Sequence, residues 1–272
     1  MLWTVWVLLA AAAYGRPVWT STRLLFHPVQ PAGRSVSDNL RAQATVNGST
    51  LHICLAVVAV VLVGYSQLER EGIGIRATAR TPLVLGRGTG AALAYLFILS
   101  AAAAMTAQAL SALHLAARVY PGAADAAHSP ELARAFLFGS VAAGIGEEIL
   151  LFAIPIALAR RTGWSTPATI ALVTVLRLAI HTYYGWGSLF VLLWIPAGFA
   201  LYQAAGSIWP LIAAHAVYDG IAFSIDSWPA AANVLVVVNL AGALLGAVVM
   251  FIGYNRFWRD RQASRQAPPA IA

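Results

Sequence analysis

The chain has 272 residues, of which 60% are hydrophobic and only 10% are charged, and its mean hydropathy is +0.74. An ordinary soluble domain carries about 25% charged residues, so this composition excludes one and indicates a membrane protein. The net charge of +7 comes from arginines that lie between and after apolar stretches, which is typical of membrane topology and not of a nucleic-acid-binding surface.

The apolar segments predict an all-α, polytopic membrane bundle of about eight transmembrane helices, because about 17–25 apolar residues are enough to cross a bilayer. The first segment is short and has no basic residue before it, so we expect a retained span or a re-entrant segment and not a secretory signal. The expected spans are 2–15, 51–68, 89–113, 132–158, 167–184, 188–205, 207–225 and 231–254.

Three clusters of arginine predict which ends of these spans face the cytoplasm. The clusters comprise Arg70, Arg76, Arg80 and Arg87, then Arg160 and Arg161, and finally Arg256, Arg259, Arg261 and Arg265. Eight spans in a bacterial cytoplasmic membrane, with both termini in the cytoplasm, satisfy all three clusters, although loop 16–50 also carries arginines and falls outside the cell in this arrangement. The expected division is 1–130 for N-terminal helices and loops, 131–225 for the core helices, 226–254 for a final helix and 255–272 for a basic, disordered cytoplasmic tail.

Glu147 and Glu148 stand in the middle of the apolar segment from Leu132 to Leu158, whose only other ionisable residue is Arg134. A charged side chain inside a membrane costs about 2.5–3.5 kcal/mol or more, so two adjacent carboxylates indicate a functional site. The alternative is a buried polar contact that only holds helices together. Neighbouring residues diverge by about 100° around a helix, so one carboxylate is expected to face the reaction centre and the other a supporting partner.

Two later spans carry polar pairs at four-residue spacing, which places both members of a pair on one helix face. These pairs are Arg177 with His181, and His215 with Asp219. At a rise of about 1.5 Å per residue, Glu147, both histidines and Asp219 lie about 14–22 Å from the cytoplasmic ends of their helices. We therefore expect one polar site inside the bundle, with Arg177 in a structural and not a catalytic position.

This set of side chains is suited to hydrolysis of an acyl bond. A glutamate can act as general base on a water that an imidazole orients, while a second imidazole donates to the oxyanion of a tetrahedral intermediate. Alternatively, Glu147, His181 and His215 are the N and O ligands of a catalytic zinc with an open position. The sequence contains no HExxH motif, and Cys54 lies in a remote segment.

The order of these residues resembles that of the CPBP family, which comprises intramembrane proteases of the CAAX prenyl protease 2 type and bacteriocin-processing, Abi-like proteins. The similar stretch covers roughly 131–225. The family's motifs EExxxR, FxxxH and HxxxN/D correspond here to Glu147–Phe152, Arg177–His181 and His215–Asp219.

The resemblance implies a role for each motif residue. Glu147 and His181 would activate the attacking water, His215 with Asp219 would stabilise the oxyanion, and Glu148 would be a supporting carboxylate. The family includes proteins described as zinc enzymes and as metal-independent glutamate proteases, and the sequence leaves both open.

Two positions depart from the family's pattern. Phe152 stands where the first motif has arginine, and Arg177 where the second has phenylalanine. We expect Arg177 to reach across from its own helix and pair with Glu148, because an intramembrane arginine needs such a partner.

The favoured interpretation is therefore an intramembrane endopeptidase. Its expected partners are the lipid bilayer and a membrane-associated peptide or protein substrate. Two alternatives remain: a non-catalytic immunity or scaffold protein with a degenerate site, and a proton-coupled transporter, since Glu, His and Asp also form proton relays. Four tryptophans at or near span ends are expected to be interface anchors: Trp186, Trp194, Trp209 and Trp228.

Overall fold

The computed structural model describes residues 1–26, 46–63, 82–115, 130–225, 233 and 237. Within these ranges every regular element is a helix, which confirms the all-α prediction. Three helical stretches there are long and apolar enough to cross a membrane, namely Gly88–Ala112, Leu137–Arg161 and Trp186–Gln203. The expected last span and the tail lie outside the described residues except for positions 233 and 237.

The described helices overlap the expected spans from 2–15 to 207–225, but several of their ends differ by five residues or more. In chain order they are α1 (Leu2–Phe26), α3 (Val46–Val63), α5 (Pro82–Ala112), α7 (Pro130–Glu148), α8 (Ile154–Arg161), α9 (Thr166–His181), α10 (Phe190–Ala205) and α11 (Trp209–Ile225). A π-helical turn, η1 (Ile149–Ala153), joins α7 to α8, and two 3-10 turns, η2 (Thr182–Tyr184) and η3 (Trp186–Leu189), lie between α9 and α10. The first helix is longer than expected, because it continues through Arg16 and Pro17 to Phe26.

Local sequence explains where the helices that carry the polar pairs begin. The side chain of Ser165 caps α9 by accepting from the backbone nitrogen of Ala168 at 3.4 Å, and Pro167 occupies the first turn, where no N–H is needed. Gly206, with a φ of +64°, ends α10 in the left-handed conformation that favours glycine. The short connection that follows brings the chain back into α11.

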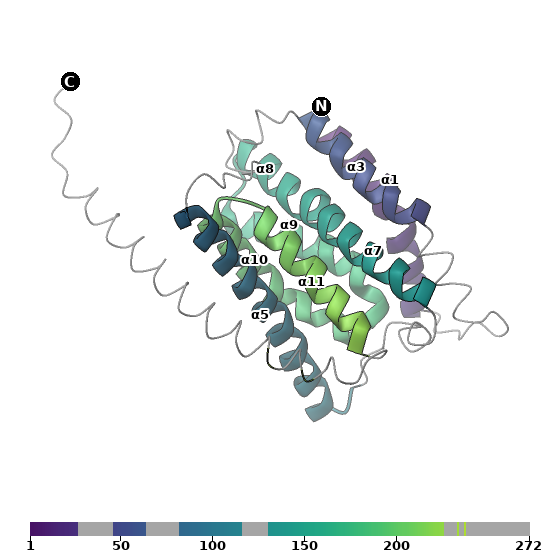
Figure 1. The fold of residues 1–272 in the computed structure, drawn as a ribbon. Helices are drawn as coiled ribbons and strands as arrows, with labels where there is room; N and C mark the ends of the chain where they lie inside the picture. The colour runs from purple at the N-terminus through teal and green to yellow at the C-terminus, as the bar shows by residue number, and fades with distance from the viewer. Residues whose placement is uncertain (27–45, 64–81, 116–129, 226–232, 234–236, 238–272) are drawn as a thin grey trace, which may run out of the picture.

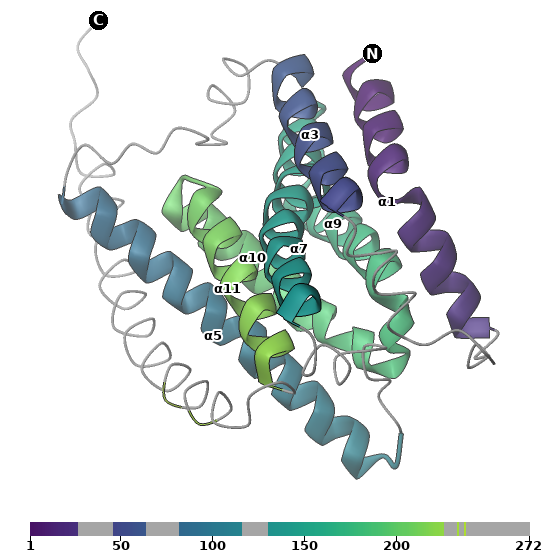
Figure 2. The same cartoon turned by 45° about the vertical axis from the view of Figure 1, so that its right-hand side comes forward.

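The packing of the helices brings the polar segments together. Helix α11 packs against both α7 and α5, α10 packs against α5 and α9, and α1 lies along α3 and α9 (Figure 1, Figure 2). Gly144 permits a close approach of α7 to α11, since a Cβ there would lie 2.8 Å from the Ile212 carbonyl oxygen and 3.1 Å from the Ala216 nitrogen. The absent side chain lets α7 touch α11 one turn before Glu147 and beside the turn that carries His215.

The inside and outside of the bundle differ as a membrane protein requires. Every residue of the π-helical turn is buried, and the buried stretch continues into α8 as far as Ala159. Large apolar side chains are exposed on the outside of several helices, among them Val57, Phe97, Val141, Val175 and Leu192. Apolar side chains on the surface of a long helix are suited to contact with lipid.

Candidate active site

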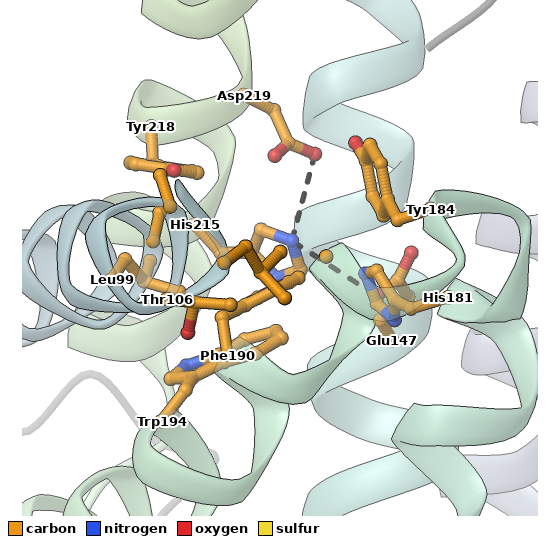
Figure 3. Close-up of a pocket in the computed structure, with 14 residues that line it drawn as sticks. Leu99, Thr106, Glu147, His181, Tyr184, Phe190, Trp194, His215, Tyr218 and Asp219 are labelled. Carbon is orange, nitrogen blue, oxygen red and sulfur yellow. Dashed lines mark ion pairs between the residues drawn. The ribbon is translucent and has the colours of Figure 1, made fainter. Parts of the chain in front are cut away.

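A cavity of about 230 Å³ lies among α5, α7, α9, α10 and α11 (Figure 3). Four of the predicted site residues line it: Glu147 from α7, His181 from α9, and His215 and Asp219 from α11. The remaining lining is mostly apolar and aromatic: Leu99, Ala103, Thr106, Ala107, Leu110, Tyr184, Gly187, Phe190, Trp194 and Tyr218. Polar side chains from three separate helices therefore face one space, as their common depth predicted.

Arg177 is fully buried and ion-paired with both glutamates. Its Nη2 donates to Glu148 Oε1 at 2.6 Å, which is the predicted contact across α9 and α7. Its Nη1 donates to Glu147 Oε2, a contact that the sequence analysis did not anticipate. A guanidinium shared by two carboxylates compensates their charges, and this compensation makes their burial tolerable.

Glu148 is fully buried and lies behind the cavity, outside its lining. Its Oε1 accepts from Arg177, from His215 Nδ1 at 2.7 Å and from the Tyr95 hydroxyl at 3.2 Å. One carboxylate oxygen thus joins side chains from α5, α9 and α11 to α7. Hydrogen bonds to a charged acceptor are stronger than neutral ones, so Glu148 holds these four helices in a defined arrangement.

The two imidazoles are oriented by different partners. His181 Nδ1 lies 2.8 Å from the Arg177 carbonyl oxygen, and because a carbonyl only accepts, Nδ1 donates and the lone pair of the neutral ring is on Nε2. His215 donates from Nδ1 to Glu148. Its Nε2 lies 3.5 Å from Asp219 Oδ2 and 4.0 Å from Glu147 Oε2, as the dashed lines in Figure 3 show. His215 Nε2 therefore faces the cavity between two carboxylates.

Trp194 is part of the site, so the expectation that it anchors the chain at the membrane interface is wrong. Its side chain is 1% exposed, and the guanidinium carbon of Arg177 lies 4.8 Å from its ring centroid. The same ring meets His215 edge-on at 5.4 Å and His181 at 5.9 Å. Trp194 lies seven residues into the expected span 188–205 and not at its very end, and this position was a signal for burial.

Tyr95 is the second residue that sequence reasoning missed. Its ring is buried between α5 and α10, where a Cβ at Gly198 would lie only 2.7 Å from it. Because Gly198 has no side chain, the Tyr95 ring fits beside it, and the Tyr95 hydroxyl can donate to Glu148. No motif identifies Tyr95 and Gly198 as a pair, because they lie about a hundred positions apart in the sequence. They meet only because the fold brings α5 and α10 together.

The predicted zinc ligands Glu147, His181 and His215 all line the cavity. The described ranges contain no group of three His, Cys, Asp or Glu side chains placed to hold a metal ion. The guanidinium of Arg177 already pairs with Glu147, so its positive charge would oppose a zinc ion bound to the same carboxylate. The zinc site stays a prediction that a chelator tests.

The three motifs lie in the part of the chain that has recognisable relatives. Residues 129–221 match the model of a family described as type II CAAX prenyl endopeptidase Rce1-like, and the match covers 93 of the 272 residues. No curated protein and no solved structure matches the chain. The matched range includes both glutamates, both histidines, Arg177 and Asp219. Residues 129–221 are therefore similar to the Rce1-like type II CAAX prenyl endopeptidase family, which confirms the resemblance to the CPBP proteases over this part of the chain.

Proposed function

We propose that the chain is an intramembrane endopeptidase that hydrolyses a peptide bond in this cavity. The observation that carries the proposal is the convergence of Glu147, His181, His215 and Asp219 from three helices on one space. The description of the matched family as endopeptidases supports the reaction class.

In the proposed reaction, Glu147 is the general base. Arg177 holds its Oε2, while its other carboxylate oxygen is directed to a water that His181 Nε2 helps to orient. Glu147 takes a proton from this water as the water oxygen bonds to the carbonyl carbon of the substrate. The proton then passes to the leaving nitrogen as the C–N bond breaks, so that the enzyme returns to its starting state.

His215 and Asp219 are proposed to stabilise the oxyanion of the tetrahedral intermediate. With Nδ1 bound to Glu148, a protonated His215 presents its Nε2–H to the cavity, and Asp219 favours that charged form. A donor fixed in this way is most effective in a site that excludes bulk water, because it needs no reorganisation when charge develops.

The substrate is proposed to be a membrane-associated peptide or protein, since the site lies inside the bundle. The proposal retains eight spans in a bacterial cytoplasmic membrane, with both termini in the cytoplasm. The apolar helices and the exposed apolar side chains support a membrane location.

A peptide-cleavage assay tests the proposal. Purified protein in detergent is incubated with a quenched-peptide library, and wild type is compared with Glu147→Gln, each with and without a chelator. We expect cleavage by the wild type, a loss of about 10²–10⁴-fold in the variant and no effect of the chelator. Glutamine keeps the shape and can still accept from Arg177, so an unchanged unfolding temperature would assign the loss to the base.

Two outcomes would contradict the proposal. Full cleavage by Glu147→Gln would remove Glu147 from the mechanism, and no cleavage by the wild type across the library would favour the non-catalytic alternative. Inhibition by the chelator would leave the protease proposal in place and support the zinc prediction.

A further inference from the structure

The carbonyl of Leu150 lies in the π-helical turn that directly follows Glu148. The backbone N–H of Ile154 donates to the Ile149 carbonyl, five residues back, and not to Leu150, which would be its partner in a regular α-helix. In a π-helix the Leu150 carbonyl would accept from the backbone N–H five residues later, at position 155. Residue 155 is a proline and has no N–H. Both backbone donors are therefore unavailable to this carbonyl.

Leu150 is fully buried, so bulk water does not reach the carbonyl either. A buried carbonyl that has lost its helical partner needs a donor from elsewhere in the protein. Proline is accepted inside a membrane helix where local π-helical turns and neighbouring helices satisfy the freed backbone groups. Pro155 thus explains why this helix departs from regular geometry immediately after the glutamates.

The donor is the indole of Trp6 on α1. Its Nε1 donates to the Leu150 carbonyl oxygen at 2.7 Å, across 144 residues of sequence, and the side chain is 5% exposed. The Trp6 ring meets Trp3 edge-on at 5.5 Å, and Trp3 stacks on Trp164, beyond the end of α8, at 5.7 Å. Helix α1 is therefore attached both to the π-helical turn and to the turn that follows α8.

We propose that Trp6 is a positioning residue of the active site: its hydrogen bond to Leu150 holds the π-helical turn and thereby sets the direction in which Glu147 and Glu148 point. An extra residue in a helical turn rotates the segments on its two sides relative to each other. The glutamates, which end α7, therefore face Arg177 and the cavity only while the turn keeps this form. The inference rests on the proposed function and extends the site to α1, which lies outside residues 129–221.

A kinetic comparison tests the proposal, with Trp6→Phe as the variant and Trp3→Phe as the matched control. Phenylalanine keeps an aromatic ring at either position, but at Trp6 it removes the donor to Leu150. We expect Trp6→Phe to lower kcat about tenfold, the size expected for one lost buried hydrogen bond, with KM unchanged. Trp3→Phe should leave both constants within about twofold of the wild type.

Repeating the pair in a Pro155→Ala background separates positioning from general stability. Alanine returns a backbone N–H to position 155, so the helix depends less on the indole. The loss caused by Trp6→Phe should then shrink. Equal losses from Trp6→Phe and Trp3→Phe, or the same loss in both backgrounds, would overturn the proposal.

A measurement without substrate distinguishes a failure of this inference from a failure of the proposed function. In protein labelled with ¹⁵N-histidine, His215 reports on Glu148, to which its Nδ1 is bonded, and His215→Gln identifies its signals. We expect Trp6→Phe to shift these signals and Trp3→Phe to leave them in place. Unshifted His215 signals in Trp6→Phe would overturn the role of Trp6, whereas an inactive wild type would overturn only the protease.

Discussion

Arg177 on α9 and Glu148 on α7 form an ion pair of 2.6 Å in which both side chains are fully buried. Arg177 occupies the place of the phenylalanine in the second family motif, and Phe152 occupies the place of the arginine in the first. Phe152 is buried and packs edge-on against Tyr202, with ring centroids 5.9 Å apart. The cation therefore reaches the glutamates from the neighbouring helix, and the site keeps one guanidinium beside two carboxylates.

Removing either partner of this pair should destabilise the protein. Arg177→Leu removes the guanidinium shared by the fully buried Glu148 and the partly buried Glu147, and it should lower the free energy of unfolding by about 3–5 kcal/mol. Glu148→Gln should cost less, about 1–3 kcal/mol, because Glu147 still compensates Arg177. Unfolding of the purified variants in detergent measures both losses. The double variant should lose less than the sum of the two, and additive losses would contradict the coupling.

Substitution at Gly144 should separate α7 from α11. An added Cβ would lie 2.8 Å from the Ile212 carbonyl oxygen, so Gly144→Ala should cost about 1–3 kcal/mol of stability and also reduce cleavage. Gly139→Ala on the same helix is the control, since nothing lies within 4 Å of a Cβ there. Alanine favours a helix by about 1 kcal/mol over glycine, so the control should be neutral or slightly stabilised. Similar unfolding temperatures for the two variants would contradict the close approach.

Filling the cavity from α5 should block the binding of substrate. Ala103 lines the cavity and the adjacent Ala104 is exposed on the outside of the helix. Ala103→Phe should fill the space in which substrate lies and lower kcat/KM by about 100-fold, the cost of displacing a reacting group by about 1 Å. Ala104→Phe adds the same bulk outside and should leave kcat/KM unchanged. Equal effects of the two substitutions would show that substrate does not enter by this cavity.

Substitutions at His215 and Asp219 on α11 should distinguish a residue that stabilises the fold from one that acts only in the reaction. His215→Gln removes the proposed oxyanion donor together with the bond to Glu148, so kcat should fall about 10²–10³-fold and stability should fall with it. Asp219→Asn, at a side chain that is 23% exposed, should lower kcat with little change in unfolding temperature. Parallel kinetic and thermal measurements compare the two. An Asp219→Asn variant as unstable as His215→Gln would make Asp219 a structural residue.

Much of the site was predictable because its signals are local. A carboxylate inside an apolar segment, and polar residues four positions apart, identify Glu147, His181, His215 and Asp219 without knowledge of which helices touch. The pair between Arg177 and Glu148 also followed, since a buried cation needs a partner and the exchange of positions indicated which one. The second bond, from Arg177 to Glu147, did not follow, because it depends on the rotation of α9 against α7.

By itself, the sequence determined that this is a helical membrane protein with one polar site, because the length of apolar segments and the spacing of polar residues are properties of single helices. The tertiary structure alone decided how that site is completed. Tyr95 reaches Glu148 past Gly198, Trp194 covers Arg177, and Trp6 satisfies the Leu150 carbonyl that Pro155 leaves without a partner. Each of these contacts joins residues far apart in the chain, and their meeting depends on which helices are neighbours and how each is turned about its axis.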